Sequence, residues 1–222
     1  MVPLQRIWCV SKLPLWLGIP LSWIARCLYS VRTSGAEQVP MSGGVLLVSN
    51  HMSYVDGVVL QLACRRPVRF VGDDDYRRSH WLADRLIRLT GTIPISSRRP
   101  LEGTRRILAA LQAGEAVCMF PESGISRTGQ LMALRSGFCW LARQAGVPVV
   151  PVAHDGLWGS VFSFAGNRYI WKSPRLLPTP VFVAFGQPIP GAEVEMLQVR
   201  QVLLDLTAQA FSERPLLRRH LA

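Results

Sequence analysis

Short apolar runs alternate with longer, more polar segments along most of this chain, and this alternation constrains its fold more than any other feature. Strands are predicted at Val45–Ser49, Val68–Gly72, Ala116–Phe120, Val147–Ala153 and Val181–Phe185. Helices are predicted at Asp56–Ala63, Arg78–Leu89, Leu101–Ala113, Leu131–Ala145 and Glu193–Phe211. Strands that alternate with helices in this way are typical of an α/β fold.

The length of the chain favours one core. A sequence of 222 residues with 49% hydrophobic content can bury one sizeable core, but it is short for two. We expect an N-terminal helical segment at residues 1–35 and one domain at residues 36–222. Within that domain, Gly156–Pro180 is rich in glycine, proline and aromatic residues, which predicts a long irregular loop bordering a site or filling a core.

The N-terminal segment has the composition of a membrane-interfacial anchor. Its charge-free run, Leu13–Ile24, is too short to span a bilayer, which takes about 20 apolar residues. Pro14 and Pro20 would break or kink one long helix, so two short helical pieces are predicted. Aromatic residues suited to the headgroup region are Trp8, Trp16, Trp23 and Tyr29. The alternatives are a helix packed on the domain and a signal peptide, which the absence of a nearby small-x-small site disfavours.

The net charge of +11 comes almost wholly from arginine, because Lys12 and Lys172 are the only lysines. Eleven arginines and five acidic residues lie between Arg65 and Arg106. Such a surface attracts nucleic acid, anionic lipid, phosphorylated substrates or an acidic carrier protein. No homeodomain, zinc-finger, KH or RRM pattern accompanies the charge, so we expect no nucleic-acid partner.

The cysteines and histidines do not form a pattern typical of metal sites. The five cysteines lack CxxC spacing and fall mostly in apolar runs, which indicates buried thiols in a reducing compartment. The four histidines are scattered along the chain. We therefore expect neither a metal ion nor a cofactor.

A histidine and an aspartate lie five residues apart after the first predicted strand, in the stretch Ser49-Asn-His-Met-Ser-Tyr-Val-Asp56. On one continuous helix, His51 and Asp56 would point about 140° apart. They can meet only if His51 precedes the helix, and Ser53 is the predicted N-cap of a capping box with Asp56. Asp56 would then orient the imidazole, leaving its other nitrogen free to act as a general base. Alternatively, Asp56 only caps its helix and His51 is a hydrogen-bonded residue at a strand end.

Three later stretches carry further polar groups. The extended run Gly91–Pro100 brings Arg98 and Arg99 to a helix start, where they could bind a phosphate or form a solvated basic turn. A glycine-rich loop with Glu122 and Arg127 follows the third predicted strand, and strand ends are where α/β proteins bind ligands. The fourth stretch, Val-Pro-Val-Val-Pro-Val-Ala-His-Asp-Gly, is a strand with two prolines, predicted near a sheet edge.

In this order, the four stretches resemble the glycerolipid acyltransferase superfamily, with its Asn-His-x4-Asp, Gly-x2-x-Ile-x-Arg-like, Phe-Pro-Glu-Gly and Val-Pro-x2-Pro-Val blocks. The resemblance covers roughly Val45 to Pro190. It implies an α/β fold with a mixed sheet flanked by helices and an N-terminal interfacial helical segment.

The resemblance also implies a reaction. His51 would be the base and Asp56 its orienter, and an acyl group would pass from acyl-carrier protein or coenzyme A directly to a lysophospholipid hydroxyl, without a covalent enzyme intermediate. The acceptor's glycerol-phosphate portion would be held by Arg98, Glu122, Ser123, Gly124 and Arg127. The expected location is the cytoplasmic face of the inner (cell) membrane, as a peripheral or monotopic protein.

The third block departs from the commonest family form, Phe-Pro-Glu-Gly-Thr-Arg-Ser. Here Ile125 stands where that form has its arginine, and only Arg127 remains. The sequence Ser-Arg-Thr-Gly is closer to acyltransferase domains of the 2-acylglycerophosphoethanolamine type. The expected acceptor is therefore a lysophospholipid, most generically 1-acylglycerol-3-phosphate, with lysophosphatidylethanolamine as the alternative. An inactive peripheral protein that binds anionic lipid is the alternative of another class.

Overall fold

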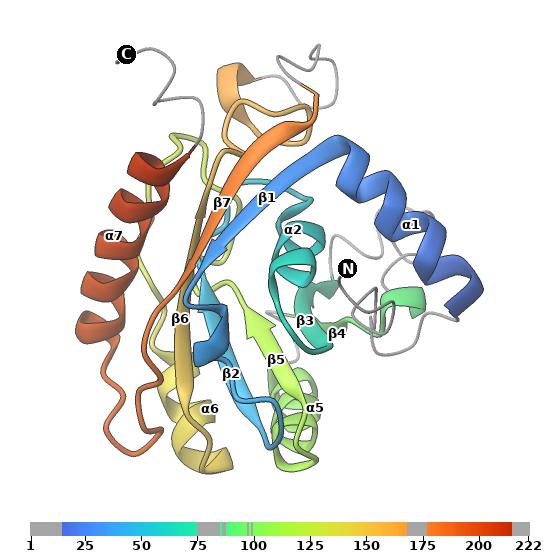
Figure 1. Ribbon diagram of the computed structural model, residues 1–222. Coiled ribbons are helices and arrows are strands. Elements are labelled where there is room, and N and C mark those ends of the chain that lie inside the picture. The colour runs from blue at the N-terminus through green and yellow to red at the C-terminus, as the bar shows by residue number, and fades with distance from the viewer. Residues whose placement is uncertain are drawn as a thin grey trace.

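Seven strands form one sheet in the part of the chain that the computed structural model describes, residues 15–74, 85, 88–96, 98, 100–167 and 177–214 (Figure 1). The strands are β1 (Tyr29–Ser34), β2 (Val45–Ser49), β3 (Val68–Asp73), β4 (Ile93–Ile95), β5 (Ala116–Met119), β6 (Val149–Asp155) and β7 (Thr179–Phe185). Their order across the sheet is β1-β7-β6-β2-β5-β3-β4. All neighbours are parallel except β6 and β7, so the sheet is mixed, and the predicted fold class is confirmed.

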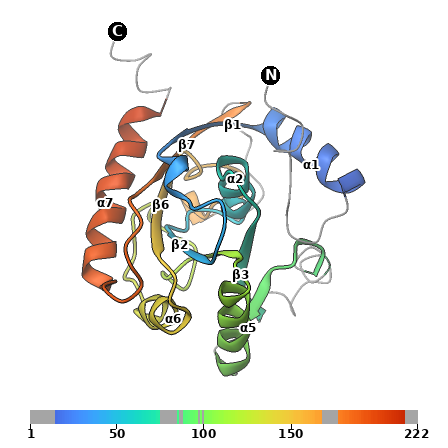
Figure 2. The same ribbon diagram turned by 60° about the horizontal axis from the view of Figure 1, so that its bottom comes forward.

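Helices cover both faces of this sheet (Figure 2). The described α-helices are α1 (Leu15–Leu28), α2 (Asp56–Ala63), α5 (Pro100–Gln112), α6 (Gly137–Ala145) and α7 (Met196–Glu213). Alternate residues of a strand point to opposite faces, so Leu46 and Val48 of β2 pack with α5, α6 and α7, whereas Val45 and Leu47 pack on the side of α2. All five residues of β2 are buried, which explains why its sequence is continuously apolar rather than alternating.

Most predicted elements are present in the structure. β2 and α2 have the predicted bounds, and the other predicted strands, α5 and α7 differ by three residues or fewer at each end. The helix predicted at Leu131–Ala145 is wrong in its first part, because α6 begins only at Gly137. The backbone N–H of Met132 instead donates to the Glu122 carboxylate at 2.6 Å, so this segment is bound to the loop after β5. Of the predicted helix Arg78–Leu89, only a few positions are described.

The N-terminal part of the structure differs from the two short helical pieces that were predicted. α1 continues through Pro20 as one helix, and Pro20 lacks the N–H that would bond to the carbonyl four residues earlier. The chain then forms β1, which was not predicted and which pairs with β7. Half of the β1 side chains are exposed, because this edge strand has only one neighbour. Residues 1–14, and with them Trp8, lie outside the described part.

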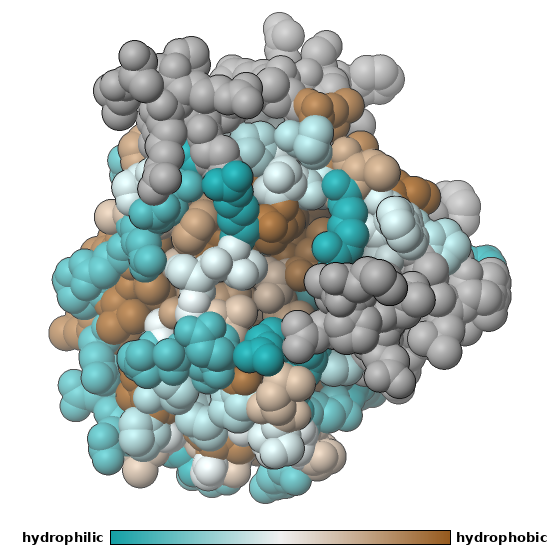
Figure 3. All heavy atoms as spheres, in the orientation of Figure 1, coloured by the Kyte–Doolittle hydropathy of each residue, from teal (hydrophilic) through white to brown (hydrophobic). Residues whose placement is uncertain are grey.

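α1 packs on β1 and α2 with one side and exposes the other. Trp23 is 60% exposed and Ile24 is 56% exposed, whereas Ser22 and Ala25 are buried. Hydrophobic atoms reach the surface at the upper right of Figure 3, where α1 meets β1 in Figure 1. Among the described helices, none is both long enough and apolar enough to cross a bilayer.

Candidate active site

The polar residues singled out in the sequence follow strands that run in the same direction. β6, β2, β5, β3 and β4 are mutually parallel neighbours, so their carboxyl ends lie along one edge of the sheet. His51 follows β2, Glu122 follows β5 and Arg98 follows β4. The fold therefore brings segments that are far apart in the sequence to one edge, the usual place for a ligand site in α/β proteins.

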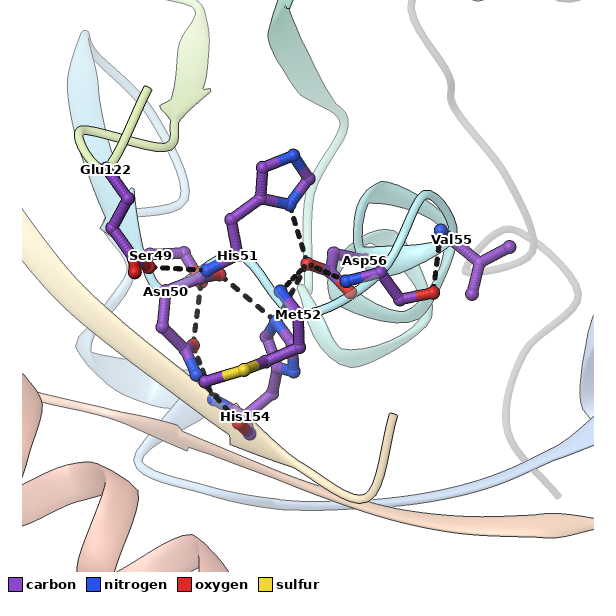
Figure 4. Close-up of polar contacts among 9 residues, drawn as sticks. Ser49, Asn50, His51, Met52, Val55, Asp56, Glu122 and His154 are labelled. Atoms are coloured by element: carbon purple, nitrogen blue, oxygen red, sulfur yellow. Dashed lines mark hydrogen bonds and ion pairs between the residues drawn. The ribbon is translucent and has the colours of Figure 1, made fainter. Parts of the chain in front are cut away.

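His51 and Asp56 meet as predicted (Figure 4). The ring nitrogen Nδ1 of His51 lies 2.8 Å from Oδ2 of Asp56. The His51 ring stacks on Phe120, with the ring centroids 4.1 Å apart and the planes 15° from parallel. Its other nitrogen points away from Asp56, and the side chain is 20% exposed. This nitrogen is thus the part of the imidazole that can meet a substrate.

Asp56 is fully buried, and the polar contacts described for its side chain are all made by the oxygen Oδ2. Besides His51, the backbone N–H groups of Met52 and Ser53 donate to Oδ2, at 2.7 and 3.1 Å. These bonds require the tight loop between β2 and α2. The N-cap of α2 is Val55, so the predicted N-cap, Ser53, is wrong by two residues, although its N–H bonds to Asp56 as a capping box requires.

Burial alone would raise the pKa of the Asp56 carboxyl group. The charges and hydrogen bonds of His154 and His51 outweigh burial and lower that pKa to about 2. Asp56 is therefore a carboxylate at neutral pH, which is the state that can orient and stabilise an imidazolium.

His154, which was not predicted as a site residue, reaches the same carboxylate from β6. Its side chain is fully buried, and its Nε2 lies 3.4 Å from Oδ2 of Asp56 and 3.2 Å from the carbonyl oxygen of Asn50. The Asn50 side chain in turn pairs with the backbone of His154: its amide donates to the carbonyl at 2.9 Å, and its oxygen accepts from the N–H at 3.0 Å. Burial lowers the pKa of His154, but the Asp56 carboxylate outweighs it, so this pKa is raised.

Glu122 lies in the site, but it faces the backbone. Oε1 accepts from the N–H of His51 at 2.7 Å, and Oε2 accepts from the N–H of Met132 at 2.6 Å. Burial raises the pKa of Glu122, although these two hydrogen bonds act in the opposite direction. The N–H of Ser126 also donates to the carbonyl of His51 at 2.8 Å. The loop after β5 therefore holds the backbone of His51 on both sides.

Three other predicted residues are exposed in this loop. Ser123 has a positive φ of 59°, and a Cβ added to Gly124 would meet no atom within 4 Å. The Arg127 guanidinium lies 5.7 Å from the centre of the Phe164 ring, which also packs near Tyr54. No carboxylate in the described part lies within ion-pair distance of Arg127. Phe164 belongs to the predicted irregular loop Gly156–Pro180, so the described part of that loop borders the site, as expected.

Arg98 is the most distant of the predicted residues. It follows β4, which is the third strand from β2, and three strand spacings amount to about 14 Å. Its side chain is exposed, and its N–H bonds to Ser96 Oγ at 3.2 Å. Such a spacing is too long for direct contact between Arg98 and His51. Arg99 lies outside the described residues.

The arrangement can accept a proton from a hydroxyl group at an oriented, partly exposed imidazole. Among the described residues, no group of three or more histidine, cysteine, aspartate or glutamate side chains could hold a metal ion. Two residues of the site were not predicted as functional. Asn50 belongs to the Asn-His-x4-Asp block, but no role was predicted for it. His154 was not predicted because the sequence does not show that β6 lies beside β2.

Comparisons with known proteins all find similarity to acyltransferases. The sequence profile of the family described as Acyltransferase matches residues 30–155. A 1-acyl-sn-glycerol-3-phosphate acyltransferase of Limnanthes douglasii is 26% identical over 81% of this chain, which spans only 58% of that relative. The enzyme of the same name from Bacillus subtilis (strain 168) is 20% identical, with 83% of this chain and 85% of the relative covered.

A solved structure has the same fold. The 1-acyl-sn-glycerophosphate (LPA) acyltransferase PlsC from Thermotoga maritima superposes with a TM-score of 0.65, covering 88% of this chain and 80% of that one, at 19% sequence identity. At this identity the likeness concerns the fold. The mixed sheet with helices on both faces is common to the two structures.

Proposed function

The chain belongs to the Acyltransferase family, and from this premise we propose that it transfers a fatty acyl group from a thioester donor to the free hydroxyl of a lysophospholipid. The donor is acyl-acyl-carrier protein or acyl-coenzyme A. The most generic acceptor is 1-acyl-sn-glycerol-3-phosphate, the acceptor in the names of the relatives.

The observation that carries this proposal is the 2.8 Å contact between His51 Nδ1 and Asp56 Oδ2. An imidazole held in this way has one fixed nitrogen and one available nitrogen, as a general base requires. The alternative, in which Asp56 only caps α2, does not account for the histidine contact.

The reaction follows from this geometry in two steps. The acceptor hydroxyl gives its proton to Nε2 of His51 while its oxygen attacks the thioester carbonyl carbon. The tetrahedral intermediate then collapses, the carbon–sulfur bond breaks, and the departing sulfur takes the proton back from the imidazolium. Asp56, ionised at neutral pH, stabilises the imidazolium between these steps, and the products are the ester and the free thiol.

Arg127 and Arg98 are proposed to bind the phosphate of the acceptor. Both are exposed, and neither forms an ion pair with a carboxylate in the described part of the chain. Arg127 stands on the loop that bonds to His51, so a phosphate bound there lies close to the base. Glu122 has a different proposed role, since both of its oxygens accept backbone N–H groups: it shapes the loop against which the acceptor lies.

Lysophosphatidylethanolamine is the second candidate acceptor. The loop after β5 has Ile125 where the commonest family form has an arginine, and this leaves Arg127 as the cation of that loop. A phosphodiester carries less negative charge than the monoester of lysophosphatidate, so it needs fewer cationic partners.

The exposed face of α1 supports a membrane surface as the working location. Trp23 and Ile24 project from this helix, and Arg26 lies on it as well. Aromatic and basic residues on one short helix favour binding in the interface of an anionic bilayer. We propose the cytoplasmic face of the cell membrane, where both thioester donors are found.

The experiment that tests the function is a substrate panel. The protein in mixed micelles is given lysophosphatidate, lysophosphatidylethanolamine or lysophosphatidylglycerol with each thioester donor, and the products are identified by mass spectrometry. We expect a diacyl product, and His51→Ala should lower its rate of formation by about 10²- to 10⁴-fold. The variant should keep the circular dichroism spectrum and the vesicle binding of the parent.

Two results would contradict the proposal. Equal turnover by parent and His51→Ala would remove the histidine from the mechanism. No product with any pair of substrates, together with intact binding to anionic vesicles, would favour a lipid-binding protein without catalytic activity.

A further inference from the structure

His154 is a buried imidazole that the proposed transfer does not use. Its Nε2 faces two acceptors, the Asn50 carbonyl oxygen at 3.2 Å and Asp56 Oδ2 at 3.4 Å. A ring nitrogen between two acceptors must carry a hydrogen, so this N–H is shared by the backbone of the His51 loop and the carboxylate that orients His51. The close-up shows His51 and His154 approaching Asp56 from different elements (Figure 4).

The position of His154 is fixed by the sheet. Its backbone is paired on one side with the Asn50 side chain and on the other with Val183 of β7. Asp56, in contrast, stands at the first turn of α2, after a loop without regular structure. His154 therefore connects this carboxylate to β6, a strand with neighbours on both sides.

We infer that His154 is a positioning residue for acyl transfer: its Nε2–H holds Oδ2 of Asp56 against Nδ1 of His51 and shares the negative charge of that oxygen. This inference rests on the proposed function, in which His51 is the base. His154 itself touches no substrate, because its side chain is fully buried.

A measurable consequence follows for the pH dependence. His51 must be neutral to accept a proton, so kcat/KM rises with pH as the imidazolium loses its proton. Without the His154 N–H, the N–H groups of Met52 and Ser53 still keep Oδ2 beside His51, and this oxygen, having lost one donor, stabilises the imidazolium more strongly. Removal of the His154 N–H should therefore move the acid limb of the profile to higher pH.

Other ionisable groups surround this pair from every neighbouring element, and they must be unchanged in the variants. They are Asp56 and His51 beside the ring, Glu122 and Cys118 from β5 and its loop, Tyr29 from β1, and Asp155, which pairs with Arg214 at 3.2 Å.

The test compares two substitutions of His154. His154→Phe keeps a planar ring but has no N–H, whereas His154→Gln places an amide N–H the same number of bonds from Cα as Nε2. We expect His154→Phe to lower kcat about tenfold or more, with little change in either KM, and to shift the acid limb upward by on the order of 0.5 to 1 pH unit. His154→Gln should restore most of both properties.

Val183→Ala is the matched control for stability. Val183 lies opposite His154 in the β6–β7 pair and is fully buried, so its truncation loosens the same strands without touching Asp56. It should lower the melting temperature and leave the acid limb in place. If His154→Phe lost activity with the acid limb of the parent, as Val183→Ala would, then His154 would be a structural residue and the inference would be wrong.

A second readout does not need turnover. In protein labelled with ¹⁵N-histidine, the ring resonances of His51 report its titration directly, and the His51→Ala spectrum assigns them. We expect the titration midpoint to be higher in His154→Phe than in the parent and in His154→Gln; equal midpoints would overturn the inference. A parent without acyl transfer would overturn the proposed function, whereas this comparison would still decide whether His154 acts on His51.

Discussion

One atom of Asp56, Oδ2, is the common acceptor for several donors in the site. Its Oδ2 receives His51, two backbone N–H groups and His154, and this set of donors keeps a fully buried carboxyl group ionised. Asp56→Asn offers at most one neutral oxygen to these donors. We expect kcat to fall by about 10²- to 10⁴-fold, because the orientation and the charge that support the imidazolium are both lost.

The neighbouring carboxylate provides the control for this substitution. Asp155 contacts Arg214 rather than His51, so Asp155→Asn should retain most of the activity. Steady-state kinetics of the two variants, measured side by side, check the prediction. A similar loss of activity in both variants would indicate that any negative charge near His51 supports the reaction, and that Asp56 is not its specific partner.

The lowered pKa of Asp56 also predicts how stability depends on pH. The pKa is about 2 in the folded protein and 3.8 as the reference value, so ionised Asp56 stabilises the fold above pH 3.8, by about 2 kcal/mol. This contribution is lost as the pH falls toward 2. In urea unfolding, the stability difference between parent and Asp56→Asn should therefore shrink between pH 4 and pH 2, and a constant difference would contradict the shift.

Removing the exposed arginines at the carboxyl edge of the sheet should weaken binding of the acceptor more than binding of the donor. Arg127→Ala and Arg98→Ala each remove a charge-assisted contact worth roughly 1.5 to 3 kcal/mol, so the acceptor KM should rise about 10- to 150-fold. The donor KM should change less. Arg65→Ala, an exposed arginine just before β3 and thus at the opposite edge, should change neither. Equal effects on both substrates would assign Arg127 and Arg98 a structural role.

The site was only partly predictable at the residue scale. The pairing of His51 with Asp56 followed from helix geometry, because the two residues can meet only across the start of a helix. The roles of Asn50 and His154 depend on β6 lying beside β2, which is a property of strand order and not of local spacing. The inward direction of Glu122 likewise depends on Met132, ten residues later, whose segment was predicted as helix.

At the scale of elements, one side of α1 packs on β1 and α2, whereas its other side exposes Trp23 and Ile24. We expect the double substitution Trp23→Ser and Ile24→Ser to weaken binding to phosphatidylethanolamine–phosphatidylglycerol vesicles by at least about tenfold, since apolar burial in the bilayer is lost. Co-sedimentation with the vesicles measures this.

α7 offers a matched control for the vesicle experiment. Leu197 and Leu204 are 70% and 40% exposed on that helix. The double substitution Leu197→Ser and Leu204→Ser removes comparable apolar surface elsewhere on the molecule, and we expect it to leave vesicle binding unchanged. If both pairs weakened binding alike, α1 would not be a specific membrane contact.

Elements with a strong local pattern were the ones that the sequence predicted well. β2 is continuously apolar because both of its faces are covered, and its bounds were predicted correctly. β1 was missed because an edge strand with exposed polar side chains lacks that pattern. The start of α6 was misplaced because the segment before it gives a backbone N–H to a distant side chain, which no local propensity indicates.

At the scale of the whole molecule, part of the basic character serves the fold. Arg66 donates to the carbonyl oxygens of Pro40, Gly43 and Gly114, at 2.8, 2.8 and 2.6 Å, and so joins the loops that precede β2 and β5. Arg66→Ala leaves these carbonyls without their partner, and we expect a loss of roughly 2 to 4 kcal/mol in the free energy of unfolding. Arg65→Ala, next in the chain and exposed, should change it by less than about 0.5 kcal/mol. Urea unfolding of the two variants checks this contrast.

The place of β2 in the sheet has a consequence for biosynthesis. Its two neighbours, β5 and β6, begin only at Ala116 and Val149, so a growing polypeptide carries an apolar strand that lacks at least one of its two partners until roughly 100 further residues have been made. At about 5 to 20 residues per second, this interval lasts roughly 5 to 20 s. Pairing strands that lie so far apart in the sequence also slows folding, because a long loop must close first. A nascent chain arrested before residue 149 leaves the middle of its sheet open along one edge, and we expect such a fragment to aggregate unless a chaperone covers it.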